Sequence, residues 1–255
     1  MLSVLLKFKK VLLGLLIAAI LLNPITSYAD TDVVIRNNDT SSVEVYIRSG
    51  EWSNEKEAKP GKRIYLDSDQ YFKTRIRVRK DENGYFISEA DINKEVASKL
   101  NEKLIEKGVK TKVALTDNAK DDLNNAGRKA KNSNPKIYLS IHHNYCQGAN
   151  GYLFMYNNND TVSKNVAQRL SNSIKQVTPV RQRENAPNLR EGKAYIGELN
   201  EFKNTDTIAV LAELGFFSDI NGDLQHITNK ETINAVSKAL ADEIYDILKE
   251  GEHNA

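Results

Sequence analysis

The stretch that decides the fold is Ile208-Ala209-Val210-Leu211-Ala212-Glu213-Leu214-Gly215-Phe216-Phe217. Residues 208–214 are apolar except for Glu213, so the segment is expected to form a buried strand. A second apolar run, residues 137–141, predicts another strand, which ends at His142. Two polar residues, Glu213 and His142, therefore stand in or directly after predicted strands.

Predicted strands and helices alternate along the chain from residue 63. The helices are recognised by apolar residues at helical spacing, and the strands by alternating or continuous apolar runs. The expected strands are 64–66, 109–115, 137–141, 152–156 and 208–214, and the expected helices are 92–105, 119–131, 160–174 and 228–248. This order predicts an α/β fold with a single domain, in which helices flank a mostly parallel central sheet.

Ligands of such sheets bind at the carboxyl ends of the strands. Polar residues stand at the carboxyl ends of three of the predicted strands: Asp67-Ser68-Asp69-Gln70, His142-His143-Asn144 and Glu213. We therefore expect these residues to meet in one crevice.

Residues 1–29 have the layout of a secretory signal peptide. Lys7, Lys9 and Lys10 precede an uncharged apolar run, and Ser27-Tyr28-Ala29 offers a small-residue cleavage site. The run is shorter than the roughly 20 residues of a membrane span, so membrane contact is expected only through an uncleaved N-terminus. The expected organisation is a signal peptide at 1–29, a lead-in with short strands at 30–62, a folded domain at 63–249 and a polar tail at 250–255.

The composition is that of a globular protein, because 40% of the 255 residues are hydrophobic and 27% are charged. The net charge of +2 becomes −1 without residues 1–29, which carry three lysines and no acid. No nucleic-acid partner is expected, because such a partner calls for a clustered basic surface. The lone Cys146 cannot form an intramolecular disulfide and is expected to be buried.

Three residues are candidates for chemistry on physical grounds. A buried carboxylate such as Glu213 needs a partner or a crevice, and perturbed carboxylates concentrate at active sites. Taken alone, His142 is more often a hydrogen-bonded residue at the rim of a site than a ligand. Glu89, before the helix at 92–105, is explained by the helix dipole alone.

Together these residues fit three motifs in one order and spacing. Ser88-Glu89-Ala90-Asp91-Ile92-Asn93, Leu139-Ser140-Ile141-His142-His143-Asn144 and Val210–Asp219 contain the patterns Glu-x-Asp-x-Asn, Ser-x-His-x-Asn and Val-Leu-x-Glu-x-Gly-Phe. They resemble the zinc-dependent N-acetylmuramoyl-L-alanine amidases of the amidase 3 type. The resemblance implies that Glu89 and His142 bind zinc and that Glu213 is catalytic. Arg128 matches a recurrent Arg of the family.

The resemblance also implies a function. A zinc-activated water would hydrolyse the amide between N-acetylmuramic acid and L-alanine, with Glu213 as general base and then acid. The partner would be bacterial peptidoglycan. A signal peptide agrees with a secreted protein that acts at the cell wall, outside the cytoplasm.

One family feature is expected to be altered. The family opens with Leu-Asp-x-Gly-His-Gly, whose His binds zinc, and the stretch expected to correspond is Leu66-Asp67-Ser68-Asp69-Gln70-Tyr71. Gln70 would then replace the His. Three outcomes stay open: Asp69 completes the zinc site, Gln70 binds the metal weakly, or the site has lost zinc.

Two alternatives to an active amidase therefore stay open. One is a catalytically silent amidase-like domain that binds peptidoglycan or regulates another wall enzyme. The other is an exported α/β protein that binds a small solute.

His143 is expected at the rim of the site, because strand alternation turns it away from His142. His226 and His253 fall in no motif and are expected at the surface.

Overall fold

The structure is a computed structural model. The structure describes residues 35–36, 43–50, 63–115, 123–187, 189–190, 193–194 and 197–253. The predicted signal peptide and its cleavage site lie outside these residues. None of the described helices is long and apolar enough to cross a membrane.

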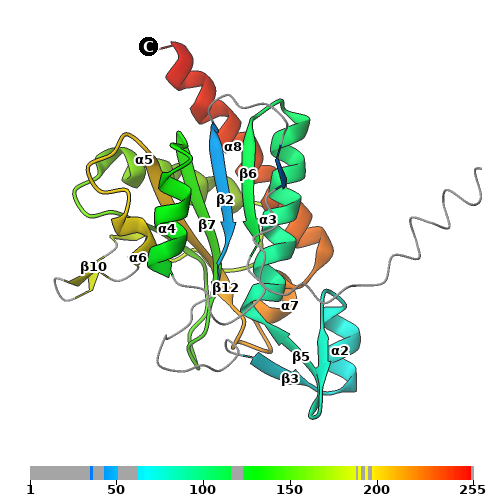
Figure 1. Ribbon diagram of the computed structural model, residues 1–255. Coiled ribbons are helices and arrows are strands. Elements are labelled where there is room, and N and C mark those ends of the chain that lie inside the picture. The colour runs from blue at the N-terminus through cyan, green and yellow to red at the C-terminus, as the bar shows by residue number, and fades with distance from the viewer. Residues whose placement is uncertain are drawn as a thin grey trace, which may run out of the picture. The chain divides into compact units, whose positions relative to one another are not determined.

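A seven-stranded sheet forms the centre of the fold, with the order β1-β6-β2-β7-β12-β8-β9 (Figure 1). Its strands are β1 (Ile35–Arg36), β2 (Val45–Ser49), β6 (Thr111–Leu115), β7 (Ile137–Asn144), β8 (Leu153–Tyr156), β9 (Ala186–Pro187) and β12 (Ile208–Phe216). The four strands β6, β2, β7 and β12 run parallel, whereas β1 pairs antiparallel with β6, and β8 pairs antiparallel with β12 and parallel with β9. The predicted mostly parallel sheet is confirmed.

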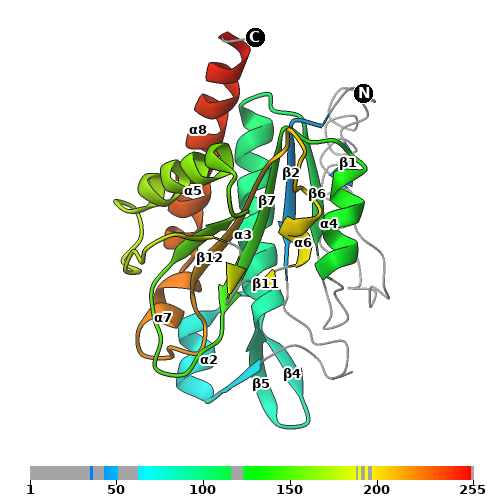
Figure 2. The same ribbon diagram turned by 90° about the vertical axis from the view of Figure 1, so that its left-hand side faces the viewer.

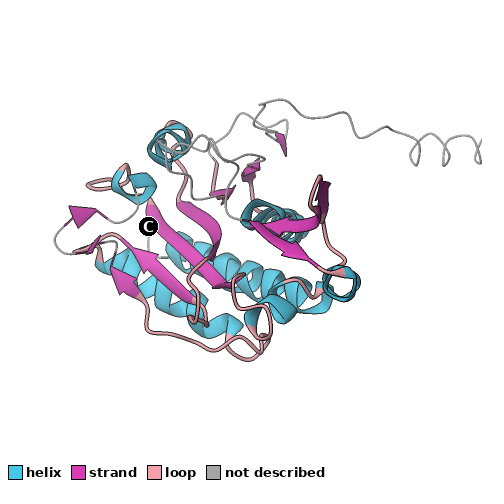
Figure 3. Ribbon diagram, turned by 90° about the horizontal axis from the view of Figure 1, so that it is seen from below, coloured by secondary structure: helices cyan, strands magenta, loops and turns pink. Residues whose placement is uncertain are grey.

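Helices cover both faces of the sheet (Figures 2 and 3). Their bounds are α3 (Glu89–Glu106), α4 (Leu123–Lys131), α5 (Thr161–Ile174), α6 (Gly197–Asn200), α7 (Asp223–Ile227) and α8 (Lys230–His253). Figure 2 shows α5 and α8 on one side of the sheet and α4 and α6 on the other. The described part of the chain therefore has three layers, helix, sheet and helix.

Alternation along the strands builds the two cores. In β2, Ile47 joins the large apolar cluster with the side chains of α3, α5 and α8, whereas Tyr46 joins the smaller cluster with Leu199 and Phe202. In β7, Leu139 and Tyr138 divide in the same way. Successive strand residues point to opposite faces, so both faces of the sheet are buried.

A second, small sheet lies outside the central one. β3 (Arg63–Leu66) and β4 (Arg79–Asp81) both pair antiparallel with β5 (Gly84–Ser88), and α2 (Ser68–Thr74) follows β3. β10 (Leu189–Arg190) and β11 (Lys193–Ala194) form a separate two-stranded pair. Figure 1 shows the small sheet and α2 at one end of the central sheet, beside the start of α3.

This arrangement corrects the predicted domain organisation. The strand at 64–66 was expected to open the central sheet, but that place belongs to β2, within the segment taken as a lead-in. A domain start at residue 63 is therefore wrong, because β2 lies between β6 and β7 in the middle of the sheet. The predicted polar tail is also shorter, since α8 continues to His253.

Candidate functional site

The carboxyl ends of β2, β7 and β12 meet the first turn of α3. Glu213 of β12 stands opposite His142 of β7 in the parallel register. His142 in turn contacts Glu89, the first residue of α3. The three residues predicted to form the site, Glu89, His142 and Glu213, are therefore brought together as expected for a parallel sheet.

The segment Ser88–Asn93 begins α3 with a capping box. The amide of Asp91 donates to Ser88 Oγ, and the amide of Ser88 donates to Asp91 Oδ2 (2.9 Å). This fixes the first turn, in which Glu89 lies 6% exposed. The positive end of the helix dipole favours the carboxylate there, and the cap directs it toward His142 rather than toward solvent.

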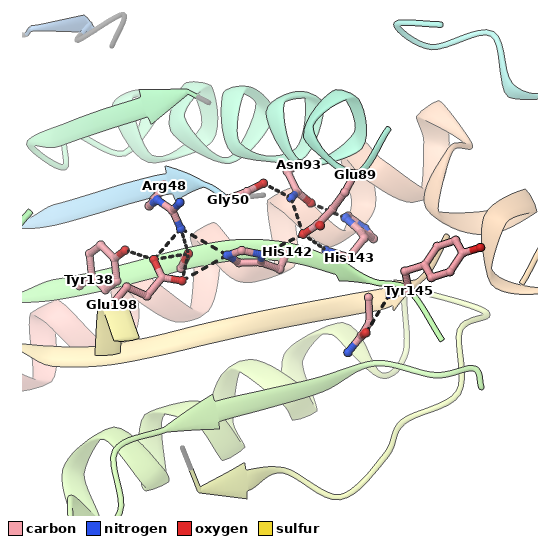
Figure 4. A network of polar contacts seen from close by, with 11 residues as sticks. Arg48, Gly50, Glu89, Asn93, Tyr138, His142, His143, Tyr145 and Glu198 are labelled. Atoms are coloured by element: carbon pink, nitrogen blue, oxygen red, sulfur yellow. Dashed lines mark hydrogen bonds and ion pairs between the residues drawn. The ribbon is translucent and has the colours of Figure 1, made fainter. Parts of the chain in front are cut away.

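Asn93 ties α3 to the ends of β2 and β7 (Figure 4). Its side-chain nitrogen donates to the carbonyl of Gly50 and to Glu89 Oε1, and its oxygen accepts from His143 Nδ1 (2.6 Å). His143 is 1% exposed, so its predicted position at the rim is wrong. The residue does point away from His142, but that side of β7 is covered by α3.

His142 has a carboxylate at each ring nitrogen (Figure 4). Nδ1 lies 2.8 Å from Glu89 Oε1, and Nε2 lies 3.2 Å from Glu198 Oε1. The ring also packs on Gly50, where any added Cβ would overlap the imidazole. Glycine is therefore required at Gly50, because the end of β2 approaches the ring too closely for a side chain.

Glu213 is 7% exposed, and its Oε2 has no hydrogen-bond partner among the described residues. The strand continues beyond it only through a bulge between Glu213 and Phe216. Gly215 occupies this bulge with φ of +153°, a conformation that other residues rarely adopt. The Gly of the third motif thus lets β12 bend directly after Glu213.

Burial and charge shift the pKa values of the site residues. Burial lowers the pKa of His142, but hydrogen bonds and charges from Glu198 and Glu89 outweigh it and raise the pKa to about 10. Burial raises the pKa of Glu213 to about 8, and the nearby His142 opposes this rise only in part. Burial, together with the charge of His142, lowers the pKa of His143 to about 3.

Two site residues were missed by the sequence reasoning. Arg48 of β2 and Glu198 of α6 form a buried ion pair (2.6 Å), with side chains 2% and 0% exposed. Burial raises the pKa of Glu198, but Arg48 and His142 have the larger, opposite effect and lower the pKa to about 2. The only sequence signal was Arg48 within the apolar run of a strand, a position where charges are rarely buried without a partner.

The expected first metal-ligand stretch lies elsewhere. Asp67 caps α2 by accepting from the amide of Gln70 (2.8 Å), and Asp69 is exposed on the same helix. β3 pairs antiparallel with β5, with Leu66 opposite Tyr85 and Arg63 opposite Ser88. Asp67 therefore follows the end of the pair that is distant from Glu89. The prediction that Asp67–Gln70 joins the crevice is wrong.

The other residues named from the sequence lie outside the contacts described above. Arg128 is exposed on α4 and lies 3.9 Å from Glu201, outside the network of His142. Cys146 is exposed, so its predicted burial is wrong. His226 is partly exposed, and the side chain of His253 lies outside the described residues.

The donor chemistry of the site fits a zinc ion in part. A carboxylate oxygen of Glu89 and Nδ1 of His142 converge, and both are donors that zinc accepts. The unpartnered Oε2 of Glu213 lies beside them. Within the described ranges, no group of three or more His, Cys, Asp and Glu residues is arranged to hold a metal ion. Among the described residues, Glu89 and His142 thus offer two donors of kinds that zinc accepts.

Comparisons with known proteins agree with this geometry. The model of the N-acetylmuramoyl-L-alanine amidase family matches residues 78–246. A search of curated proteins found no match.

Solved structures with the same fold include several amidases. An N-acetylmuramoyl-L-alanine amidase from Clostridium difficile 630 has a TM-score of 0.60 at 24% identity, covering 82% of this chain and 97% of the other. The catalytic domain of the amidase CwlV from Bacillus (Paenibacillus) polymyxa has a TM-score of 0.57 at 20% identity, covering 81% and 98%. The amidase AmiC2 of Nostoc punctiforme has a TM-score of 0.57 at 16% identity, covering 83% and 99%. At these identities the likeness shows the fold.

Proposed function

The chain belongs to the N-acetylmuramoyl-L-alanine amidase family, peptidoglycan hydrolases that cleave the amide between N-acetylmuramic acid and L-alanine, and we propose that Glu89, His142 and Glu213 carry out this reaction here. The observation that supports this most is the unpartnered carboxylate oxygen of Glu213, buried beside His142. A structural carboxylate would have a partner, whereas a general base needs a free oxygen for the proton it takes. The family match favours this activity over a catalytically silent domain.

Glu89 and His142 are the residues proposed to hold zinc. They supply one oxygen and one nitrogen on converging sides, which suits the ligand preference of this metal. Bound there, zinc would supply a Lewis acid that lowers the pKa of a bound water and polarises the amide carbonyl.

The place of β2 in the central sheet suggests a third ligand. With β2 as the opening strand, Ile47-Arg48-Ser49-Gly50-Glu51-Trp52 corresponds to the family pattern Leu-Asp-x-Gly-His-Gly. Gly50 then matches the glycine, and Glu51 stands where the family has its His. A carboxylate is among the donors that zinc prefers, whereas the neutral amide of Gln70 is not. Glu51 lies outside the described residues, so its role as a ligand stays a prediction.

Glu213 would act first as the general base and then as the general acid of the reaction. Its free Oε2 would take the proton of the attacking water and later pass it to the amine of the leaving L-alanine. Burial, together with the charges of Glu89 and Glu198, raises its pKa to about 8, and a positive charge held by Glu89 and His142 would lower it. The residue is then ionised when it must accept a proton and protonated when it must donate one.

The family acts on the cell wall, and we propose that residues 1–29 export this chain to the same place. The basic, apolar and small-residue parts of that segment support this proposal.

Product analysis tests the proposed reaction. Purified protein supplied with zinc is incubated with peptidoglycan, and the soluble products are identified by mass spectrometry. We expect free stem peptides that begin with L-alanine and glycan chains without peptides. Release of muropeptides with the lactyl–alanine bond intact would instead assign a different bond and would overturn the proposal.

A further inference from the structure

The proposed reaction does not use Glu198, although this carboxylate contacts the side chains of four residues near the site: Arg48, Tyr138, Ser140 and His142. Glu198 is wholly buried in α6. Its Oε2 accepts from Arg48 Nη1 (2.6 Å) and from the hydroxyl of Tyr138 (2.6 Å), and Ser140 Oγ donates to Oε1 (3.1 Å). These donors come from β2 and β7, so they hold the carboxylate ionised and fix its position against the sheet.

The remaining contact of Glu198 is with His142. Nε2 of His142 lies 3.2 Å from Glu198 Oε1, while Nδ1, on the other edge of the ring, faces Glu89 (2.8 Å) (Figure 4). Arg48 Nη1 also lies 3.3 Å from Nε2. The partner of the ring therefore depends on whether Nε2 carries a proton. A protonated Nε2 donates a hydrogen bond to Glu198, whereas an Nε2 lone pair would accept one from Arg48.

We propose that Glu198, fixed by Arg48, is a positioning residue for His142. It accepts a hydrogen bond from the Nε2–H group of His142, so that Nδ1 is left without a proton as the ligand nitrogen beside Glu89. Arg48 Nη1 makes its shortest bond to Glu198 Oε2 (2.6 Å) and lies 3.3 Å from Nε2, so the carboxylate oxygen Oε1 of Glu198, at 3.2 Å, is the better partner of Nε2. Histidine ligands of metals generally donate their other ring N–H to a carboxylate or carbonyl, which fixes the tautomer and raises the basicity of the ligand nitrogen. The inference rests on the proposed function, because it takes His142 as a metal ligand.

The backbone around Glu198 is fixed as well. Gly127 of α4 packs directly on α6, and a Cβ added there would come within 2.8 Å of Glu198 Cα and closer still to its carbonyl oxygen. Because backbone atoms cannot give way as side chains do, the approach of α4 determines where Glu198 lies. The positioning unit thus comprises Arg48, Glu198 and the helix contact at Gly127.

The first test determines, in metal-free protein, whether Nε2 of His142 carries a proton. Nitrogen-15 spectra of the full chain with labelled histidine are compared between the wild type and Glu198→Gln. We expect a protonated Nε2 of His142 in the wild type, with a proton shifted downfield that exchanges slowly with water, and weaker bonding with faster exchange in the variant. A wild-type Nε2 without a proton would assign its contact to Arg48 and would overturn the proposal, as would an unchanged signal in the variant.

Removing Glu198 alone leaves a buried arginine without its partner, which destabilises proteins strongly. The double variant Arg48→Met/Glu198→Leu removes both charges with similar side-chain volumes and is the version expected to stay folded if the single variant does not. The expected loss of the slowly exchanging Nε2 proton is the same in both variants.

The second test measures zinc affinity by competition with a chelator. Glu198→Gln is expected to weaken zinc binding about 10- to 100-fold. The matched control is Glu243→Gln, which breaks another arginine–glutamate bond of 2.6 Å, to Arg169, and is expected to bind zinc as the wild type does. A folded Glu198→Gln variant with wild-type affinity would contradict the proposal.

The two tests separate this inference from the proposed function. If the wild type binds no zinc but shows the Nε2 proton bonded to Glu198, the proposed metal site fails and the orientation of His142 stands. If zinc binds with wild-type affinity in every Glu198 variant, the metal site stands and the positioning role fails.

Discussion

At the scale of single residues, Glu213 is held in a costly environment. Its carboxyl is buried, one oxygen has no partner among the described residues, and burial raises its pKa to about 8. An ordinary structural role would favour a neutral or hydrogen-bonded side chain at this place. The fold therefore keeps a group that works against its own stability, as is common at catalytic sites.

The pH dependence of stability should show this cost. The pKa of Glu213 is about 8 in the folded state and 4.5 in the reference state, so the unfolded chain loses its proton first as pH rises. Ionisation then favours the unfolded state increasingly from pH 4.5 to 8. In metal-free protein, Glu213→Gln is expected to raise the free energy of unfolding relative to the wild type, more at pH 8.5 than at pH 5.5. Urea titrations at both pH values check this, and a pH-independent difference would contradict it.

The buried His143 is expected to lower the stability of the fold at acid pH, whereas Glu213 lowers it at alkaline pH. Burial and the charge of His142 lower its pKa to about 3, below the reference value of 6.5. The unfolded chain takes up this proton as pH falls below 6.5, so the fold loses stability progressively down to pH 3. His143→Gln is expected to be destabilised at pH 7.5, because the bond to Asn93 is altered, but to lose less further stability at pH 5 than the wild type. Parallel losses in the two proteins would rule out His143 as the source.

The predictability of the site residues follows from how local their signals are. Glu89, His142 and Glu213 each stand in a motif or at the end of a strand, and their meeting follows from the parallel sheet. Arg48 and Glu198 are 150 residues apart, and their pairing exists only once β2 and α6 are in place. Cys146 was misjudged because average burial says nothing about one particular loop.

At the scale of elements, the contact between α4 and α6 has a sharp requirement. Gly127→Ala would place a methyl group against the backbone of Glu198, and overpacking of this kind costs about 1–3 kcal/mol. We expect a lower melting temperature and weaker zinc binding. Gly251→Ala in α8 is the control, because nothing lies within 4 Å of the added group and alanine favours a helix by about 1 kcal/mol. A neutral Gly127→Ala variant would show that α6 can move freely.

The identity of the opening strand gives another test. If β3 carried the ligand stretch, Gln70→His would restore the family's zinc ligand and strengthen zinc binding. Since Gln70 lies on α2, after the end of β3 that is distant from Glu89, we expect no change in zinc affinity. Gly50→Ala is expected to abolish zinc binding, because the added methyl group would displace His142. Chelator competition on both variants checks this, and tighter binding by Gln70→His would restore the rejected alignment.

At the scale of the whole molecule, the order of elements was largely predictable. Helical spacing and apolar runs identified the cores of α3, α5, α8, β7 and β12, and their alternation gave the three-layer fold. The sheet that each strand joins could not be predicted from such patterns. β2 and β3 are both short apolar runs in polar surroundings, and only the register with β6 and β7 distinguishes them.

In the proposed reaction, Glu89, His142 and Glu213 act as one hydrolytic site. The most direct test measures bound zinc per chain and release of peptides with N-terminal L-alanine from peptidoglycan, on the same samples of wild type and Glu213→Gln. We expect close to one zinc per chain in both proteins and peptide release by the wild type alone, with a loss of at least about 100-fold in the variant. Folded, zinc-loaded wild type without hydrolysis, or hydrolysis retained in the variant, would contradict the account.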